Sequence, residues 1–249
     1  MHKATHHFDL VNWWLDSVPE TVYAQGGLFF YGAEAGRRHG LARPYDRAHG
    51  RPAADTDPFA LRLADAPVLR SLYLDAEAAD GYHRDRNVFG PGVSIEDDMA
   101  VLVRYASGAT LTYHLTAYAP WEGYRIAFNG SAGRLELLVE ESAWTRPGAS
   151  GAVTDPVPHA GTGGRTELLL RPFWEPPREV RTATGEGGLG GGDARMLADL
   201  FGDRTPDPLG RAADATAGAR SLVTGLAANL SLETGAVVRT REVLDVLDA

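Results

Sequence analysis

The sequence predicts an α+β fold in which helices pack on one face of a large, mostly antiparallel, open sheet. Four segments with the two-residue alternation of β-strands follow one another without an intervening helix, which excludes a parallel, doubly wound sheet for that region. The last third of the 249 residues has apolar side chains at helical spacing instead. Strands and helices segregated in this way are typical of the α+β class. We expect one domain over residues 1–249.

The predicted strands begin with a hairpin around the turn Ser107-Gly108. Residues 99–105 alternate between apolar and other side chains, and residues 111–117 return from the turn. Two more strands, at 123–128 and 134–139, follow directly. We expect these four strands to form one antiparallel meander. Further strands are predicted at 21–31, 167–170 and 179–182.

Helices are predicted where apolar residues recur at three- and four-residue steps, or where Gly and Pro are missing. The longest starts near Ala212 and is expected to stop at Gly235. Residues 32–58 and 145–165 are polar or rich in Gly and Pro without a sustained period, so they are predicted to be mobile loops. The remaining helices are predicted at 6–15, 66–79 and 193–201.

Composition excludes several classes of function. Lys and Arg number 24 against 33 Asp and Glu, and the net charge of -9 repels phosphate backbones and anionic lipid, so neither nucleic acid nor a membrane is expected as a partner. The chain has no cysteine, which excludes disulfides and thiolate chemistry and fits a cytoplasmic location.

A Gly-rich segment at residues 185–190 fits the G-x-G-x-x-G spacing of dinucleotide sites. Such a site needs a buried apolar strand directly before it, and residues 178–184 are too polar to form one. We therefore predict a loop that binds no cofactor.

The densest chemical cluster lies at the start of the chain, where Lys3 and Asp9 accompany three histidines. On a helix, His2, His6 and Asp9 would share one face. Such a face can transfer protons, because imidazole has a reference pKa of about 6.5. It can also bind a metal, since two histidines one turn apart plus a carboxylate match zinc-site spacing. The third interpretation is a helix end with incidental or capping histidines.

Three further features are candidates for contacts. The acidic turn at 96–98 is expected to be solvated. Alternate residues of the strand at 111–117, including Thr112 and His114, are polar. Such a face suits either a ligand or a contact between sheets, and we expect the contact. Trp121 is of a type that anchors cores or interfaces, and it follows Pro120 at a strand end, where binding loops gather.

The order of these motifs is that of a known family. The motifs are spread over nearly the whole chain. They are residues 2–14 (H-K-A-T-H-H-F-D-L-V-N-W-W), the sheet motifs within 95–130, and the segments at 190–201 and 217–235. Together they resemble the C-terminal domain of the glucose-fructose oxidoreductase / inositol dehydrogenase (Gfo/Idh/MocA) family, whose catalytic helix reads D-x-x-x-H-x-x-D. The Asp of that motif falls on His2 here.

The resemblance implies the substrate-binding half of an NAD(P)-dependent oxidoreductase that acts on a sugar, cyclitol or related polyol. By position, His6 matches the catalytic base, and Lys3 lies beside it as a second catalytic candidate. The candidate substrate-binding residues are His2, His7, Asp9, Arg86, Trp121 and Asp193.

The resemblance also implies partners. NAD or NADP is expected in the full-length enzyme, on an N-terminal Rossmann domain that we expect this chain to lack, so no cofactor and no activity are expected of the chain alone. A homo-oligomer is expected through the open sheet face. Two alternatives stay open: a non-catalytic sugar-binding or oligomerisation module, and a histidine-based metal-binding protein.

Overall fold

The fold is α+β, as the sequence predicts, in a computed structural model that describes residues 4–144, 164–182, 191–202 and 206–247, with side chains up to 243. The chain divides into two compact units. The first comprises Met1–Phe30, Ser94–Ala117 and Leu197–Ala249, and the second comprises Tyr31–Val93 and Tyr118–Met196.

The first unit contains a four-stranded antiparallel sheet in the order β3-β2-β1-β8. Its central strand β2 confirms the predicted alternation, because Met99, Val101, Val103 and Tyr105 are all buried. The bounds are Pro19–Gly27 for β1, Asp98–Tyr105 for β2, Thr110–Thr116 for β3 and Val238–Arg239 for β8.

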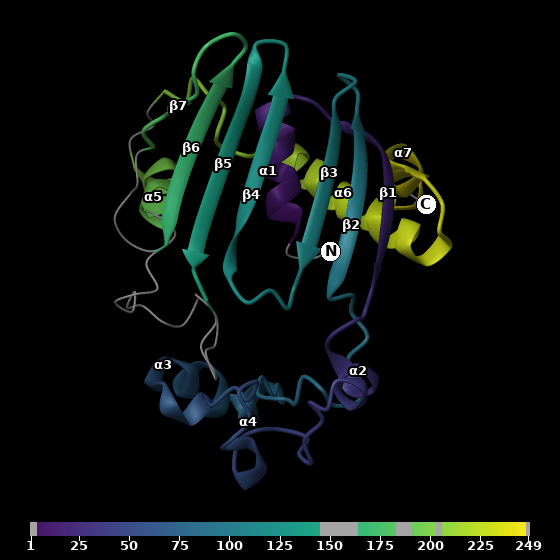
Figure 1. Cartoon of the computed structure of the whole chain (residues 1–249), viewed down its shortest axis with the longest axis vertical. Coiled ribbons are helices and arrows are strands. Elements are labelled where there is room, and N and C mark those ends of the chain that lie inside the picture. Colours follow the sequence, from purple (N-terminus) through teal and green to yellow (C-terminus); the bar gives the residue numbers. More distant parts are fainter. Residues whose placement is uncertain (1–3, 145–163, 183–190, 203–205, 248–249) are drawn as a thin grey trace. The chain divides into compact units, whose positions relative to one another are not determined.

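Among the described residues, the helices that lie wholly within the first unit are α1 (Thr5–Leu15), α6 (Ala215–Thr234) and α7 (Thr240–Leu247). Figure 1 shows α6 lying across one face of the sheet. The carboxylate of Asp214 caps α6 by accepting a 2.8 Å hydrogen bond from the Ala217 amide, and Gly235 ends the helix at a φ of 69°, as predicted.

One core joins these elements. Val11 of α1, Val22 of β1, Val103 of β2 and Ala227 of α6 are buried against one another in it. Because α1 contributes to this core from its buried face, its other residues are left for solvent or for neighbouring elements.

The acidic turn before β2 is not simply solvated, so that prediction is wrong for Asp97. Its carboxylate is buried and accepts hydrogen bonds from the amides of Phe29 at 2.7 Å and Phe30 at 2.9 Å. The turn therefore anchors the chain where it leaves β1. The sequence pattern could not predict this role of Asp97, because the hydrogen-bond donors are backbone amides far away in the chain.

The second unit contains another antiparallel sheet, ordered β4-β5-β6-β7. The four predicted strands between 99 and 139 are present, but they pair as two hairpins in different sheets, and β3 and β4 are not paired. The expected single meander is therefore wrong, because β2 pairs with β1 in one sheet and β5 pairs with β6 in the other. The bounds are Glu122–Gly130 for β4, Gly133–Ser142 for β5, Arg165–Pro172 for β6 and Arg178–Glu179 for β7.

The predicted helix at 66–79 is broken in the structure. A short α3 (Pro67–Leu69) leads into a π turn, η4 (Arg70–Leu74), and α4 (Glu77–Asp80) follows after an interruption. Gly81 then closes α4 with a φ of 69°. The other helical segments are α2 (Gly32–Arg38), η2 (Pro52–Ala54), η3 (Leu63–Asp65) and α5 (Gly192–Phe201).

A polar network around the buried carboxylate of Asp85 holds this region together. Arg47 donates to the carboxylates of both Asp85 and Glu77, and the backbone amide of His49 also donates to Asp85, at 2.7 Å.

The predicted mobility of residues 32–58 stays a prediction. Most of the other predicted loop, residues 145–163, lies outside the described residues. In the described part of the chain, every helix is too short or too polar to cross a bilayer.

Candidate functional site

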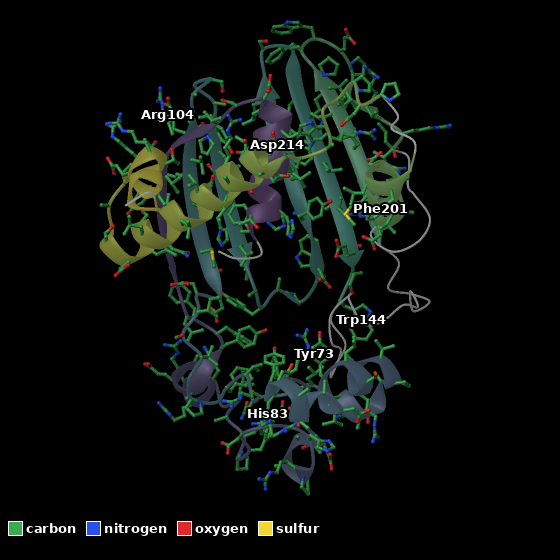
Figure 2. The ribbon with its side chains drawn as sticks, turned by 180° about the vertical axis from the view of Figure 1, so that it is seen from behind. Tyr73, His83, Arg104, Trp144, Phe201 and Asp214 are labelled. Carbon is green, nitrogen blue, oxygen red and sulfur yellow. The ribbon has the colours of Figure 1, made fainter. Side chains whose placement is uncertain are left out.

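Helix α1 brings two of the predicted site residues to one pocket. His6 and Asp9 lie one turn apart on α1 and line a pocket of about 540 Å³ against α6, together with Thr5. Figure 2 shows α6 crossing α1, with Asp214 at the start of α6. The shared face predicted for His6 and Asp9 is therefore confirmed. The α6 side of the pocket is formed by Ala213, Gly218, Ser221, Leu222, Gly225, Leu226 and Asn229.

Small residues on α6 leave the space for this pocket. Gly218, Ser221 and Gly225 follow one another at helical spacing along the wall. A methyl group built on Gly218 would meet nothing within 4 Å, so the space beside it is open. The Ser221 hydroxyl donates to the Gly218 carbonyl at 2.9 Å, which holds its oxygen on the helix.

His6 is the titratable group of the pocket that is best suited to proton transfer. Its side chain is exposed, and within the described residues nothing hydrogen-bonds to it. Asp9, one turn later, is half-buried. A carboxylate at this spacing can stabilise the imidazolium that forms when His6 takes up a proton. The pocket thus places an exposed imidazole and a half-buried carboxylate one helical turn apart.

His7 lies on a different edge of α1 and is not part of the pocket wall. Its Nδ1 lies 3.0 Å from the hydroxyl of Tyr113, on β3. Partial burial of the ring, and then the charge of His6, lowers the pKa of His7 from its usual 6.5. The helix thus separates one open imidazole from one that is held by the sheet.

The other predicted site residues are not in this pocket. His2 and Lys3 lie outside the described residues. Arg86 is exposed, between Asp85 and Asn87, which are both buried. Trp121 lies under the guanidinium of Arg125, and Asp193 is exposed in the first turn of α5. These three belong to the second unit.

A charged hollow on the second sheet was not predicted. Arg134 and Arg171 donate through Nε to the two oxygens of Glu136, at 2.6 and 2.8 Å, and they lower the pKa of that carboxyl. The hollow, about 310 Å³, also includes Arg125 and Glu167. The alternation of charged residues along β5 was the available signal, but its meaning depends on pairing with β6.

The described residues offer neither a metal centre nor a Rossmann-type cofactor fold. Within the described ranges, no group of three His, Asp or Glu side chains could hold a metal ion. Both sheets of the described part are antiparallel, so this part of the chain has no parallel β-α-β unit of the kind that binds NAD or NADP in the Rossmann fold. The Gly-rich segment at 185–190 lies outside the described residues.

The family described as "Oxidoreductase family, C-terminal alpha/beta domain" (GFO_IDH_MocA_C) matches residues 1–239. The chain therefore belongs to the Gfo/Idh/MocA oxidoreductase family, and the match is to its C-terminal domain.

Individual relatives agree with the family. The protein named "Putative oxidoreductase YteT", from Bacillus subtilis (strain 168), is 34% identical over 241 residues, which are 90% of this chain and 51% of YteT. The chain thus spans about half the length of the curated relative that it matches.

Solved structures are similar at lower identity. An aldose-aldose oxidoreductase from Caulobacter crescentus, complexed with glycerol, is 11% identical with a TM-score of 0.47, over 95% of this chain and 45% of that one. A structure titled as a "putative nadph-dependent oxidoreductase", from Desulfitobacterium hafniense, is 14% identical with a TM-score of 0.48, over 96% and 47%. At this level of similarity, neither structure identifies the substrate.

Proposed function

We propose that the chain is the substrate-binding half of an NAD(P)-dependent oxidoreductase that acts on a sugar, cyclitol or related polyol, with His6 as the proton acceptor. The observation that carries the proposal is the pocket in which His6 and Asp9 face α6. Thr5, Ser221 and Asn229 add hydroxyl and amide groups, which suit a ligand with several hydroxyls.

The proposed chemistry divides between the chain and its cofactor. Oxidation of a secondary alcohol removes a hydride from carbon and a proton from oxygen, and a nicotinamide cofactor takes the hydride. His6 is proposed to take the proton, because an imidazole changes its protonation near neutral pH. Asp9 would stabilise the resulting charge. The cofactor is proposed to bind elsewhere in the full-length enzyme, since the described residues do not fit it.

Ligand binding to the chain itself tests the proposal. We expect a panel of sugars, cyclitols and linear polyols, titrated by NMR, to include one that shifts the amide signals of α1 and α6 around His6. His6→Gln should weaken that binding about fivefold, which is the typical worth of one hydrogen bond. His49→Gln is the matched control, because His49 is an exposed histidine of the second unit. Signals that stay unmoved with every compound would contradict the proposal.

Catalysis is tested in the full-length enzyme. Removing a general base typically costs 10²- to 10⁴-fold in rate, so His6→Gln should lower kcat by about that factor while polyol binding changes much less. Equal kcat values for the wild type and His6→Gln would show that His6 is not the proton acceptor.

A non-catalytic binding module is the second candidate, because the described residues do not fit a dinucleotide. Both candidates predict polyol binding at the pocket, but only the oxidoreductase predicts oxidation of the bound polyol when the complete protein is supplied with NAD or NADP.

A cytoplasmic location stays a prediction based on the absence of cysteine.

We also propose that the chain forms a homo-oligomer through an open sheet face. In the first unit, core helices pack on one face of the sheet, and Tyr23, Leu102 and Thr112 lie in register on the other. Leu102 is 52% exposed between Tyr23 and Thr112, so this face presents a row of uncharged side chains that a second copy of the chain is proposed to cover. Light scattering should give a multimer for the wild type and a smaller species for Leu102→Glu. Leu72→Glu, at a residue 58% exposed, is the control. A monomeric wild type would contradict the proposal.

A further inference from the structure

The open face of the first sheet carries charge at the two ends of its central strand β2. Buried residues of β2 alternate with residues that lie on the face opposite the core. In chain order, the residues of β2 on this open face are Asp98, Ala100, Leu102 and Arg104. Six positions separate Asp98 from Arg104, which is about 20 Å along a strand. The strand is therefore negative at one end of the face and positive at the other.

The neighbouring strands add no aspartate, glutamate, lysine or arginine to this face. The side chains in register with it are Thr21, Tyr23 and Gln25 on β1, and Thr110, Thr112, His114 and Thr116 on β3.

Two residues of β3 hold the Asp98 carboxylate on the face. Nε2 of His114 lies 3.1 Å from one carboxylate oxygen, and the hydroxyl of Thr116 donates to the other at 3.0 Å. The Asp98 side chain is nevertheless 25% exposed. Its negative charge is thus fixed in place and accessible to a partner.

A second copy of the chain can meet this face in two simple ways. Two identical faces that pack together are related by a two-fold axis, and aligned sheets keep their strands within about 30° of each other. If the axis runs along β2, Arg104 faces Arg104 of the second copy, and Asp98 faces Asp98. If the axis crosses β2 at Val101, the two β2 strands run in opposite directions, and Arg104 of each copy faces Asp98 of the other.

We propose that two copies of the chain pair through this face with their β2 strands antiparallel and the axis at Val101, so that Arg104 of each copy forms an ion pair with Asp98 of the other. The inference rests on the homo-oligomer proposed above, and it gives that oligomer its orientation. Like charges that face each other across an interface are strongly unfavourable, whereas opposite charges fix the register of the partners. The charges of β2 therefore select the antiparallel arrangement.

Side-chain size favours the same arrangement. Ala100 and Leu102 lie one position to either side of Val101, so Leu102 of one copy lies opposite Ala100 of the other. Leu102 is 52% exposed, and the small side chain of Ala100 leaves space for it. With the axis along β2, two leucines would meet instead, and two alanines would leave a gap.

The distance between two spin labels tests the orientation. The chain has no cysteine, so Ser107→Cys, in the exposed turn after β2, gives one attachment site in each copy. The antiparallel arrangement places the two turns at opposite ends of the pair, so double electron–electron resonance should give about 35 Å between the labels. The other arrangement brings the turns together, and a distance below about 20 Å would overturn the proposal. The same label in Leu102→Glu is the control and should give no defined distance.

Charge reversal tests the ion pairs. Arg104→Glu should raise the dissociation constant of the pair about tenfold or more, because each new glutamate faces Asp98. Adding Asp98→Lys should bring the constant back toward that of the wild type, since opposite charges then face each other again. Arg51→Glu, at an exposed arginine of the second unit, is the control and should leave the constant unchanged. Sedimentation equilibrium measures all four proteins.

Two results of the charge reversal would overturn the proposal: an unchanged constant for Arg104→Glu, or a double variant that pairs no better than Arg104→Glu alone. The spin-label distance decides the orientation even if a charge variant does not fold, because it is measured with Asp98 and Arg104 in place.

Ala100→Leu separates the two arrangements by the sign of its effect. In the antiparallel arrangement it removes the space opposite Leu102, so the dissociation constant should rise. In the other arrangement it would fill the gap between two alanines, so a lower constant would overturn the proposal. Ala100 is exposed in the single chain, so the substitution does not enter the core.

The inference and the proposed function fail in different ways. A wild type that stays monomeric at every concentration would contradict the proposed oligomer, and the inference with it. A multimer whose labels lie below about 20 Å apart would contradict only the orientation. Polyol binding at the pocket of His6 and Asp9 is measured separately and does not depend on either result.

Discussion

The side-chain oxygen of Ser231 accepts a hydrogen bond from the backbone amide of Ala24 at 2.9 Å, and it donates to the carbonyl of Ala236 at 2.6 Å. Ser231 is fully buried. One hydroxyl therefore joins α6 to β1 and fixes the chain just after the helix, at the place where α6 crosses the sheet.

Replacement of Ser231 by alanine should destabilise the first unit by about 1–3 kcal/mol, because it leaves a buried amide and a carbonyl without their partner. Urea unfolding followed by circular dichroism measures the change. Thr216→Ala, at an exposed threonine in the first turn of the same helix, should change the unfolding free energy by less than about 0.5 kcal/mol. Equal losses for the two variants would show that the Ser231 bridge adds nothing.

Gly133 should not tolerate a side chain. It has a φ of 142°, and a methyl group built on it would lie 2.2 Å from the carbonyl oxygen of Arg171. Gly133→Ala should therefore cost about 2–4 kcal/mol through backbone strain and displacement of β6. Gly108→Ala should cost only about 1 kcal/mol, because the space around Gly108 is open although its φ is 87°. Similar melting temperatures for the two variants would contradict this prediction.

The stability of the first unit should fall in acid through His7. Its pKa is lowered in the fold, so below the ordinary value of 6.5 the unfolded chain binds a proton more readily than the folded chain. The unfolding free energy should decrease as the pH falls below about 6.5, and it should decrease less in His7→Gln. Urea unfolding at several pH values measures the slopes. Identical slopes in the two proteins would rule out His7 as the source.

Tyr105 should make the fold sensitive to alkali. Burial raises its pKa to about 12, so above the ordinary value near 10 the unfolded chain ionises first and unfolding becomes easier. Within the described residues its buried hydroxyl has no hydrogen-bond partner. Tyr105→Phe should therefore cost little or no stability at neutral pH, and it should weaken the alkaline decline. A loss above about 2 kcal/mol at neutral pH would show that the hydroxyl is satisfied after all.

Short-range sequence patterns predicted helices and strands correctly where the residues nearby in the sequence determine which side chains are buried. The alternation of β2 and the stop of α6 at Gly235 are of this kind. The shared face of His6 and Asp9 is another, because helix geometry alone places them together. The sequence from 66 to 79 predicted one continuous helix, because it contains no Gly or second Pro that would mark the interruption at η4.

Contacts between distant segments were not predictable in the same way. The Tyr113 hydroxyl reaches His7 across 106 positions of the chain, and nothing in the sequence near either residue marks the pair. The sharing of Glu136 between Arg134 and Arg171 likewise depends on the pairing of β5 with β6. Sheet pairing of this kind is set by the tertiary fold, so the expected single meander was wrong.

Phe8 sets the rotation of α1 about its own axis. Consecutive residues of an α-helix point about 100° apart, so a roll of one position would exchange His6 and His7 between the α6 side and the β3 side. Phe8 is fully buried and takes part in no proton transfer, yet its burial decides which imidazole opens to the pocket and which is held by Tyr113. In this helix, the burial of an apolar side chain determines which of two neighbouring imidazoles faces α6.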